Sequence, residues 1–184
     1  MISPVYKALV LELDGEMLDE ARKAWILLKE EFAIQYISQN SPCPHMTLAS
    51  GIQADTDALV DCLRDVTSKF QPLEVEGNGI AVLVVESPVI YIRWKLTQAM
   101  TELRNKLQVS LMDAQNIKYE PCCDWLAKTS LAYKDSGYEN LGESLRTLGA
   151  LNFYQNMTCS KLGIYDYSEA LGERKIEELS FDPS

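Results

Sequence analysis

Two short segments of the chain carry side chains that could act together on a phosphate. Residues 45–50 (His-Met-Thr-Leu-Ala-Ser) align with residues 128–133 (Lys-Thr-Ser-Leu-Ala-Tyr). Each segment has a basic residue, any residue, a hydroxyl residue and then Leu-Ala. Each is predicted to form a strand that follows one helix and precedes another, so the pair is interpreted as an internal repeat.

The repeat predicts a cradle for one phosphate. Residues i and i+2 of a strand face the same side, so His45 projects with Thr47 and Lys128 projects with Ser130. If the two strands lie side by side, the hydroxyls donate hydrogen bonds to non-bridging oxygens, while the basic groups neutralise charge and move protons. His45, Thr47, Lys128 and Ser130 are therefore the candidate catalytic residues.

The two segments resemble the motifs of the 2H phosphoesterase superfamily, which includes LigT-like RNA 2′-5′ ligases and 2′,3′-cyclic phosphodiesterases. That superfamily is defined by two H-x-[ST] motifs. The first is intact at residues 45–47, whereas residues 128–130 have lysine where the family has histidine. The separation of the motifs, the order of elements and the chain length are also similar. The resemblance implies an α+β fold of two pseudo-symmetric lobes, with duplicated β-α-β units and antiparallel sheets around a central cleft.

The resemblance also implies an activity. It indicates a metal-independent phosphoesterase without a cofactor, acting on a small nucleotide 2′,3′-cyclic phosphate or an RNA 2′-5′ end. In the family, one histidine is the general base and the other the general acid. The spacing Lys128-x-Ser130-x-x-Tyr133 is similar to the H-x-S-x-x-Y form of the cyclic phosphodiesterase branch, whose tyrosine helps to line the nucleotide site. Tyr133 is therefore a candidate substrate-binding residue.

The lysine at position 128 changes what the site can do. His45 is the single histidine of the chain, so it is the one natural base near neutral pH. A free lysine has a pKa of about 10.4, so Lys128 is expected to hold the phosphate or donate a proton, and to act as a base only if its pKa is strongly lowered. Losing one acid/base partner typically costs ~10²–10⁴-fold in rate. The sequence thus predicts a weakened enzyme, an altered one, or a binding pocket.

Three further side chains have two interpretations each. Tyr91 and Arg93 alternate on one face of a predicted hairpin strand and are candidate substrate-binding residues, for base stacking or phosphate contact. Cross-strand pairing on the surface is the alternative. Trp125 precedes the second motif, and packing is favoured for it over a place at the pocket.

The hydrophobic period alternates between two and 3.6, which indicates mixed α and β structure in the order β-α-β-α-ββ-α-β-α-β. We expect one domain over residues 1–184. Strands are expected at 6–13, 45–52, 80–85, 89–96, 128–133 and 157–167, with apolar helical stripes at 18–32, 59–70, 100–111 and 141–148. The charged segment after Gly172 is expected to be loosely held, with Leu179 and Phe181 as anchors.

Three local signals refine this expectation. Residues 77–79 (Gly-Asn-Gly) indicate a turn or bulge, and residues 86–88 (Glu-Ser-Pro) a three-residue hairpin loop. Residues 136–139 (Ser-Gly-Tyr-Glu) match a capping box that would open the last helix.

Composition limits the partners. The chain is 47% hydrophobic and 24% charged, with a formal net charge of −10. Binding of extended nucleic acid needs a basic face, so long DNA or RNA is excluded as a partner while a small phosphate is not.

With one histidine and no C-x-x-C, no metal site is expected. Five cysteines, the absence of an apolar run of about 20 residues, and no secretory signal predict a cytoplasmic protein with reduced thiols and no membrane partner. A monomer is also expected.

Two functional hypotheses remain open. In the first, the chain is an active phosphoesterase in which His45 activates water. In the second, the chain has lost catalysis and uses the same cleft to bind a nucleotide or a protein partner. The intact first motif and both hydroxyls favour the first, whereas the acidic surface and the missing histidine favour the second.

Overall fold

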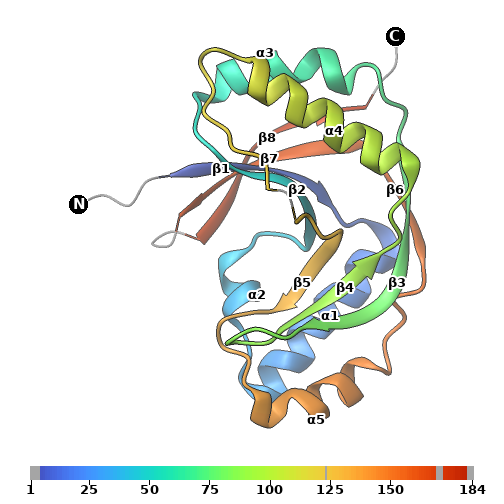
Figure 1. The fold of residues 1–184 in the computed structure, drawn as a ribbon. Helices are drawn as coiled ribbons and strands as arrows, with labels where there is room; N and C mark the ends of the chain where they lie inside the picture. The colour runs from blue at the N-terminus through green and yellow to red at the C-terminus, as the bar shows by residue number, and fades with distance from the viewer. Residues whose placement is uncertain (1–4, 123, 169–171, 182–184) are drawn as a thin grey trace.

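The computed structural model describes residues 5–122, 124–168 and 172–181. In these residues strands and helices alternate through most of the chain (Figure 1). The elements are β1 (Tyr6–Glu12), α1 (Gly15–Phe32), α2 (Tyr36–Asn40), β2 (His45–Ile52), α3 (Thr56–Thr67), β3 (Leu73–Leu83), β4 (Val89–Trp94), α4 (Gln98–Asp113), β5 (Lys128–Ala132), α5 (Tyr138–Leu148), β6 (Asn156–Cys159), β7 (Lys161–Ser168) and β8 (Gly172–Ser180).

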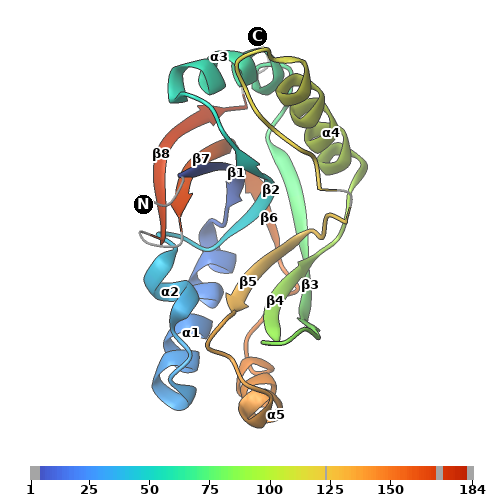
Figure 2. The same cartoon turned by 60° about the vertical axis from the view of Figure 1, so that its left-hand side comes forward.

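The strands form two antiparallel four-stranded sheets. Their orders are β2-β1-β7-β8 and β5-β4-β3-β6. Figures 1 and 2 show α3 and α4 together at one end of the molecule and α1 and α5 at the other, with the sheets between them. The predicted α+β fold with two antiparallel sheets is confirmed.

The duplication is visible in the sheet order. The unit β1-α1-α2-β2 and the unit β4-α4-β5 each place two antiparallel strands next to each other. In each sheet the strand that carries one copy of the repeat, β2 or β5, is an edge strand. The two motifs therefore occupy equivalent places, and the edges that carry them lie near each other.

Helical periodicity decides which faces are buried. Met100, Leu103, Leu107 and Leu111 recur every three or four residues along α4, and all four are fully buried. The Thr97 side chain accepts a hydrogen bond from the Met100 backbone N–H and so caps the helix. The larger of two apolar clusters in the described residues contains side chains of both sheets and of the helices that cover them.

The C-terminal region departs from the expectation of one strand and a loose tail. Residues 156–159 form β6 in one sheet and residues 161–168 form β7 in the other, so the chain changes sheets at Ser160. The charged segment is strand β8, which pairs with β7 along its length. Phe181 is buried and Leu179 packs partly against the core. The charges belong to a strand at a sheet edge, where they discourage pairing with another chain.

Two local predictions at the hairpin also need correction. Strand β3 ends at Leu83, so the loop spans residues 84–88 and is longer than expected. Ser136 does not cap α5: the N-cap residue is Gly137, and the buried Ser136 hydroxyl donates to the carbonyl of Pro88. The Tyr138 hydroxyl donates to the carbonyl of Val85 at 2.6 Å. Side chains at the start of α5 thus donate to carbonyls of the hairpin loop.

The predicted bulge is present inside β3. The register with β4 shifts between Gly77 and Ile80, and Gly79 has a φ of +74°. A Cβ at Gly77 would collide with the backbone oxygen of Phe153. The bulge lets the first half of β3 pair with β6 and the second half with β4.

Candidate functional site

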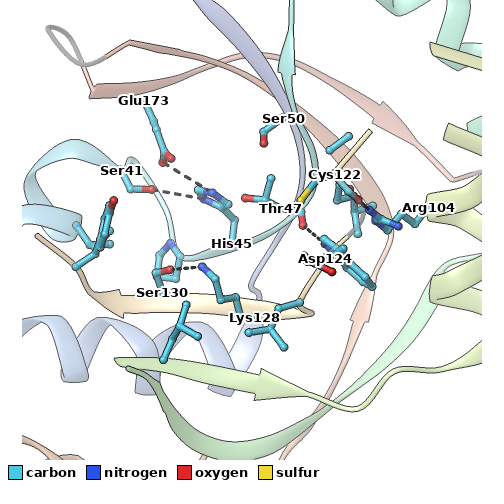
Figure 3. A pocket seen from close by; sticks show the side chains of 18 of the residues that line it. Ser41, His45, Thr47, Ser50, Arg104, Cys122, Asp124, Lys128, Ser130 and Glu173 are labelled. Carbon is cyan, nitrogen blue, oxygen red and sulfur yellow. Dashed lines mark hydrogen bonds and ion pairs between the residues drawn. The ribbon is translucent and has the colours of Figure 1, made fainter. Parts of the chain in front are cut away.

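A pocket of about 590 Å³ lies between the edge strands β2 and β5 (Figure 3). Its lining includes His45 and Thr47 from β2 and Lys128 and Ser130 from β5. The structure therefore brings all four candidate catalytic side chains to one cavity. The reason is the alternation of strand side chains, because the intervening residues Met46 and Thr129 are buried on the opposite side.

A backbone carbonyl determines which ring nitrogen of neutral His45 carries the hydrogen. Its Nδ1 lies 2.9 Å from the carbonyl oxygen of Cys43. A carbonyl oxygen only accepts, so Nδ1 carries the hydrogen and the neutral ring has its lone pair on Nε2. The side chain is 11% exposed and its Nε2 faces the pocket (Figure 3). An imidazole held in this way is arranged to accept a proton at Nε2.

Tyr165 supports the histidine ring from β7. The two rings meet edge to face with centroids 5.1 Å apart. The Tyr165 hydroxyl donates to Glu12 at 2.6 Å. Burial, followed by the bond to Glu12, raises the pKa of Tyr165 above its ordinary value, so this hydroxyl stays protonated.

Lys128 is the second basic group of the pocket. Its Nζ donates to the Ser130 hydroxyl at 2.8 Å. Burial lowers the pKa of Lys128, and the nearby Glu173 carboxylate partly offsets that effect. An ammonium that is poorly solvated gains from any anion that reaches it, and it is also a stronger acid than a lysine in water.

The three candidate substrate-binding residues are placed differently. Tyr133 lines the pocket, is 39% exposed, and meets Tyr36 edge to face. Tyr91 pairs with Ser130 across the strands and is buried, whereas Arg93 pairs with Lys128 and is exposed. Neither Tyr91 nor Arg93 is among the residues that line the pocket, because β4 lies one strand inward from the edge.

Trp125, for which the sequence favours packing over a place at the pocket, forms one wall of the pocket together with Arg104, which the sequence interpretation missed. Trp125 packs partly against the core and also lines the pocket. Its indole N–H donates to the Thr47 carbonyl at 2.8 Å. The Arg104 guanidinium lies 4.7 Å from the centroid of the indole ring and donates to the carbonyls of Leu48 and Cys122. Since Arg104 lies on α4, no motif in the sequence connects it with the two strands.

Glu173 is the other residue that was missed. It lines the pocket from β8, with its Oε2 3.8 Å from His45 Nε2. No sequence pattern points to Glu173, because the charged segment that carries it is expected from the sequence to be loosely held. Its pairing with β7 brings this carboxylate over the histidine.

Other candidate chemistry in the described residues is limited. No group of three His, Cys, Asp or Glu side chains gathers there as a metal ion would require. Cys43, Cys62, Cys122 and Cys159 are free, and Cys123 lies outside the described residues. None of the helices described is both long and apolar enough to cross a bilayer.

Neither a protein-family model nor a curated protein sequence matches the chain. Solved structures do match along nearly its whole length. TT0787 of Thermus thermophilus is 10% identical, with 97% of this chain and 99% of that chain covered and a TM-score of 0.70. LigT of E. coli in complex with NADP+ is 11% identical, with 98% and 99% covered and a TM-score of 0.65. A further match, a phosphoesterase, is 12% identical, with 97% and 99% covered and a TM-score of 0.59. The chain therefore has the two-lobed 2H phosphoesterase-like fold of LigT.

Proposed function

We propose that the chain is a metal-independent phosphoesterase of the 2H type, with activity reduced or altered by the lysine of its second motif. Its substrate is a small nucleotide 2′,3′-cyclic phosphate or an RNA 2′-5′ end. One observation carries the proposal: His45 and Thr47 meet Lys128 and Ser130 in one pocket, from equivalent edge strands. The LigT structures hold NADP+, 3′-AMP and ATP, which supports a small nucleotide as the ligand of this fold.

The proposed hydrolysis uses the pocket as follows. His45 Nε2 takes a proton from a water whose oxygen attacks phosphorus in line. The new P–O bond forms while a P–O bond to the ribose breaks, and the Lys128 ammonium protonates the ribose oxygen that leaves. The lowered pKa of Lys128 makes it a better acid for this step. Afterwards the imidazolium loses its proton to solvent and Lys128 regains one.

The two hydroxyls stabilise the charge on phosphorus oxygens. In the free pocket Ser130 accepts from Lys128, so its own hydrogen remains available for a non-bridging oxygen. Thr47 is on β2 beside His45 and supplies a second hydroxyl. Each such donor is most effective where charge develops in the transition state. Tyr133, at the mouth of the pocket, is proposed to contact the nucleoside.

The test is hydrolysis of adenosine 2′,3′-cyclic phosphate by the native protein and by His45→Ala. Tyr154→Ala, which removes a highly exposed side chain that does not line the pocket, is the control. We expect a slow native rate that His45→Ala lowers ~100-fold or more and that the control leaves unchanged. Equal rates for the native protein and His45→Ala would reject the proposal.

The second candidate function is nucleotide binding without turnover. The observation that favours it is the replacement of an acid/base histidine by Lys128, whose Nζ is engaged with Ser130. Binding of the cyclic nucleotide with no hydrolysis would select this candidate. If neither ligand binding nor turnover is detected at millimolar concentration, the protein-interaction hypothesis replaces both.

A further inference from the structure

Glu173 places a carboxylate directly beside the proposed phosphate site. Its Oε2 is 3.8 Å from His45 Nε2, within reach of an ion pair and too far for a hydrogen bond. That oxygen is buried and finds no hydrogen-bond donor in the described part of the chain. Figure 3 shows the side chain reaching toward the histidine ring from β8. The side chain as a whole is 34% exposed, and a carboxylate oxygen that is shielded from water without a donor contributes nothing to fold stability.

The carboxylate cancels positive charge in the pocket. The lining contains two cations, Lys128 and Arg104, and two carboxylates, Glu173 and Asp124. Arg104 and Asp124 lie on the far side from Glu173 (Figure 3). Of the four charged side chains of the lining, Lys128 and Glu173 therefore lie on the side of His45, and their formal charges sum to zero. A phosphate that contacts both basic residues has to sit close to the Glu173 carboxylate.

We propose that Glu173 acts as a charge filter, which makes the pocket prefer monoanionic phosphodiesters to dianionic phosphomonoesters. The inference rests on the proposed function and extends it to substrate and product selection. A cyclic phosphodiester has one negative charge, whereas a phosphomonoester approaches two above its second pKa of about 6. Repulsion from Glu173 and attraction to Lys128 both grow in proportion to the ligand charge, so the second charge of a monoester gains no net attraction and its desolvation is not offset. Opening the cyclic ester adds a charge, so the same residue also promotes product release.

The size of the effect follows from one extra unit charge. At the short separation that the pocket imposes, and with the screening typical near a protein surface, that charge changes affinity on the order of 10-fold or more. Removing the carboxylate is expected to tighten the monoester by that factor more than it tightens the cyclic ester.

The experiment compares two ligands on three proteins by isothermal titration calorimetry at about pH 8, where the monoester is dianionic. The ligands are adenosine 2′,3′-cyclic phosphate and adenosine 2′-monophosphate. The proteins are the native chain, Glu173→Gln, and Glu177→Gln, which removes the same charge from an exposed position on β8. We expect Glu173→Gln to tighten the monoester ~10-fold more than the cyclic ester, and Glu177→Gln to leave both affinities unchanged.

The possible results distinguish a failure of the charge filter from a failure of the proposed function. If the native protein binds the cyclic ester and Glu173→Gln changes both ligands equally, the charge filter is wrong and the proposed function stands. If no protein binds either ligand, the proposed function fails and the filter with it. A measurement on the native protein alone guards against a Glu173→Gln variant that does not fold. There the O-methyl ester of adenosine 2′-monophosphate, a monoanion of similar shape, should bind more tightly than the monoester, and weaker binding would overturn the filter.

Discussion

At the scale of single residues, the site depends on which atom of each basic group is free. The Cys43 carbonyl holds the Nδ1 hydrogen of His45, which leaves Nε2 for proton transfer. Lys128 has the opposite property, since an ammonium has no lone pair until it loses a proton. The pocket thus has one natural base and one natural acid, which is enough for one direction of phosphoryl transfer.

Lys128→His should restore a second imidazole at a position that already lines the pocket. We expect hydrolysis of adenosine 2′,3′-cyclic phosphate to rise ~10-fold or more, because a positioned acid/base group contributes at least that much. Lys106→His, at an exposed position on α4, is the matched control and should have no effect. The combination with His45→Ala should fall to the rate of His45→Ala alone, since both groups act on one transfer. An unchanged rate in Lys128→His would show that supporting residues no longer fit a histidine.

The lowered pKa of Lys128 also predicts a dependence of stability on pH. In the unfolded chain a lysine has a pKa of about 10.4, and burial lowers the pKa of Lys128 in the fold. Between the two values the unfolded chain binds more protons, so this residue makes the free energy of unfolding rise with pH. We expect the native protein to gain stability relative to Lys128→Met as the pH rises toward the unfolded-chain pKa of about 10.4. Urea denaturation at several pH values measures the difference, and a difference that falls with pH contradicts the burial of the ammonium.

At the scale of elements, the equivalent edge positions of β2 and β5 are what join the two motifs. Strand β4 is flanked by a strand on each side, and its side chains Tyr91 and Arg93 do not line the pocket. A motif on such an inner strand would therefore not reach the pocket. Strand β8 completes the site from the other sheet edge by supplying Glu173. Its ordering therefore matters for function as well as for stability.

Phe181 tests whether β8 is firmly attached. It is 4% exposed and donates its backbone N–H to the Ser160 carbonyl at 2.8 Å. Phe181→Ala should lower the free energy of unfolding by ~3 kcal/mol, as is usual for a buried phenylalanine. Tyr154→Ala, at a 73% exposed position, should change it by less than ~0.5 kcal/mol. Urea denaturation compares the two, and similar small losses would mean that β8 is loosely held after all.

At the scale of the whole molecule, charge separates the surface from the site. The chain has a formal net charge of −10, yet the charged side chains that line the pocket, apart from His45, cancel. A long polyanion meets repulsion over the acidic surface, while a small phosphate ester meets Lys128 and His45 inside the cavity. This distribution favours a small nucleotide over extended RNA as the ligand.

Metal independence is a prediction about the same pocket. The charges that act on phosphate there come from side chains, and the described residues contain no cluster of metal-type ligands. Any hydrolysis of adenosine 2′,3′-cyclic phosphate should therefore persist in excess EDTA, with a change in rate of less than ~2-fold. Removing a catalytic acid/base group, by comparison, typically lowers a rate by ~10²–10⁴-fold. Activity that EDTA abolishes and a divalent ion restores would contradict the proposed mechanism.

The sequence by itself determined the repeat, the alternation that points His45 and Thr47 the same way, and the helical stripe of α4, because these depend on local periodicity. It also indicated the α+β fold. The tertiary structure decided what spacing cannot encode. The charged C-terminal segment pairs with β7 as strand β8, and this pairing places Glu173 beside His45. Packing of α4 against β2 brought Arg104 to the Trp125 ring, and the place of β4 in its sheet kept Tyr91 and Arg93 away from the pocket. Contacts between residues far apart along the chain form only when the sheets are assembled, so no local pattern records them.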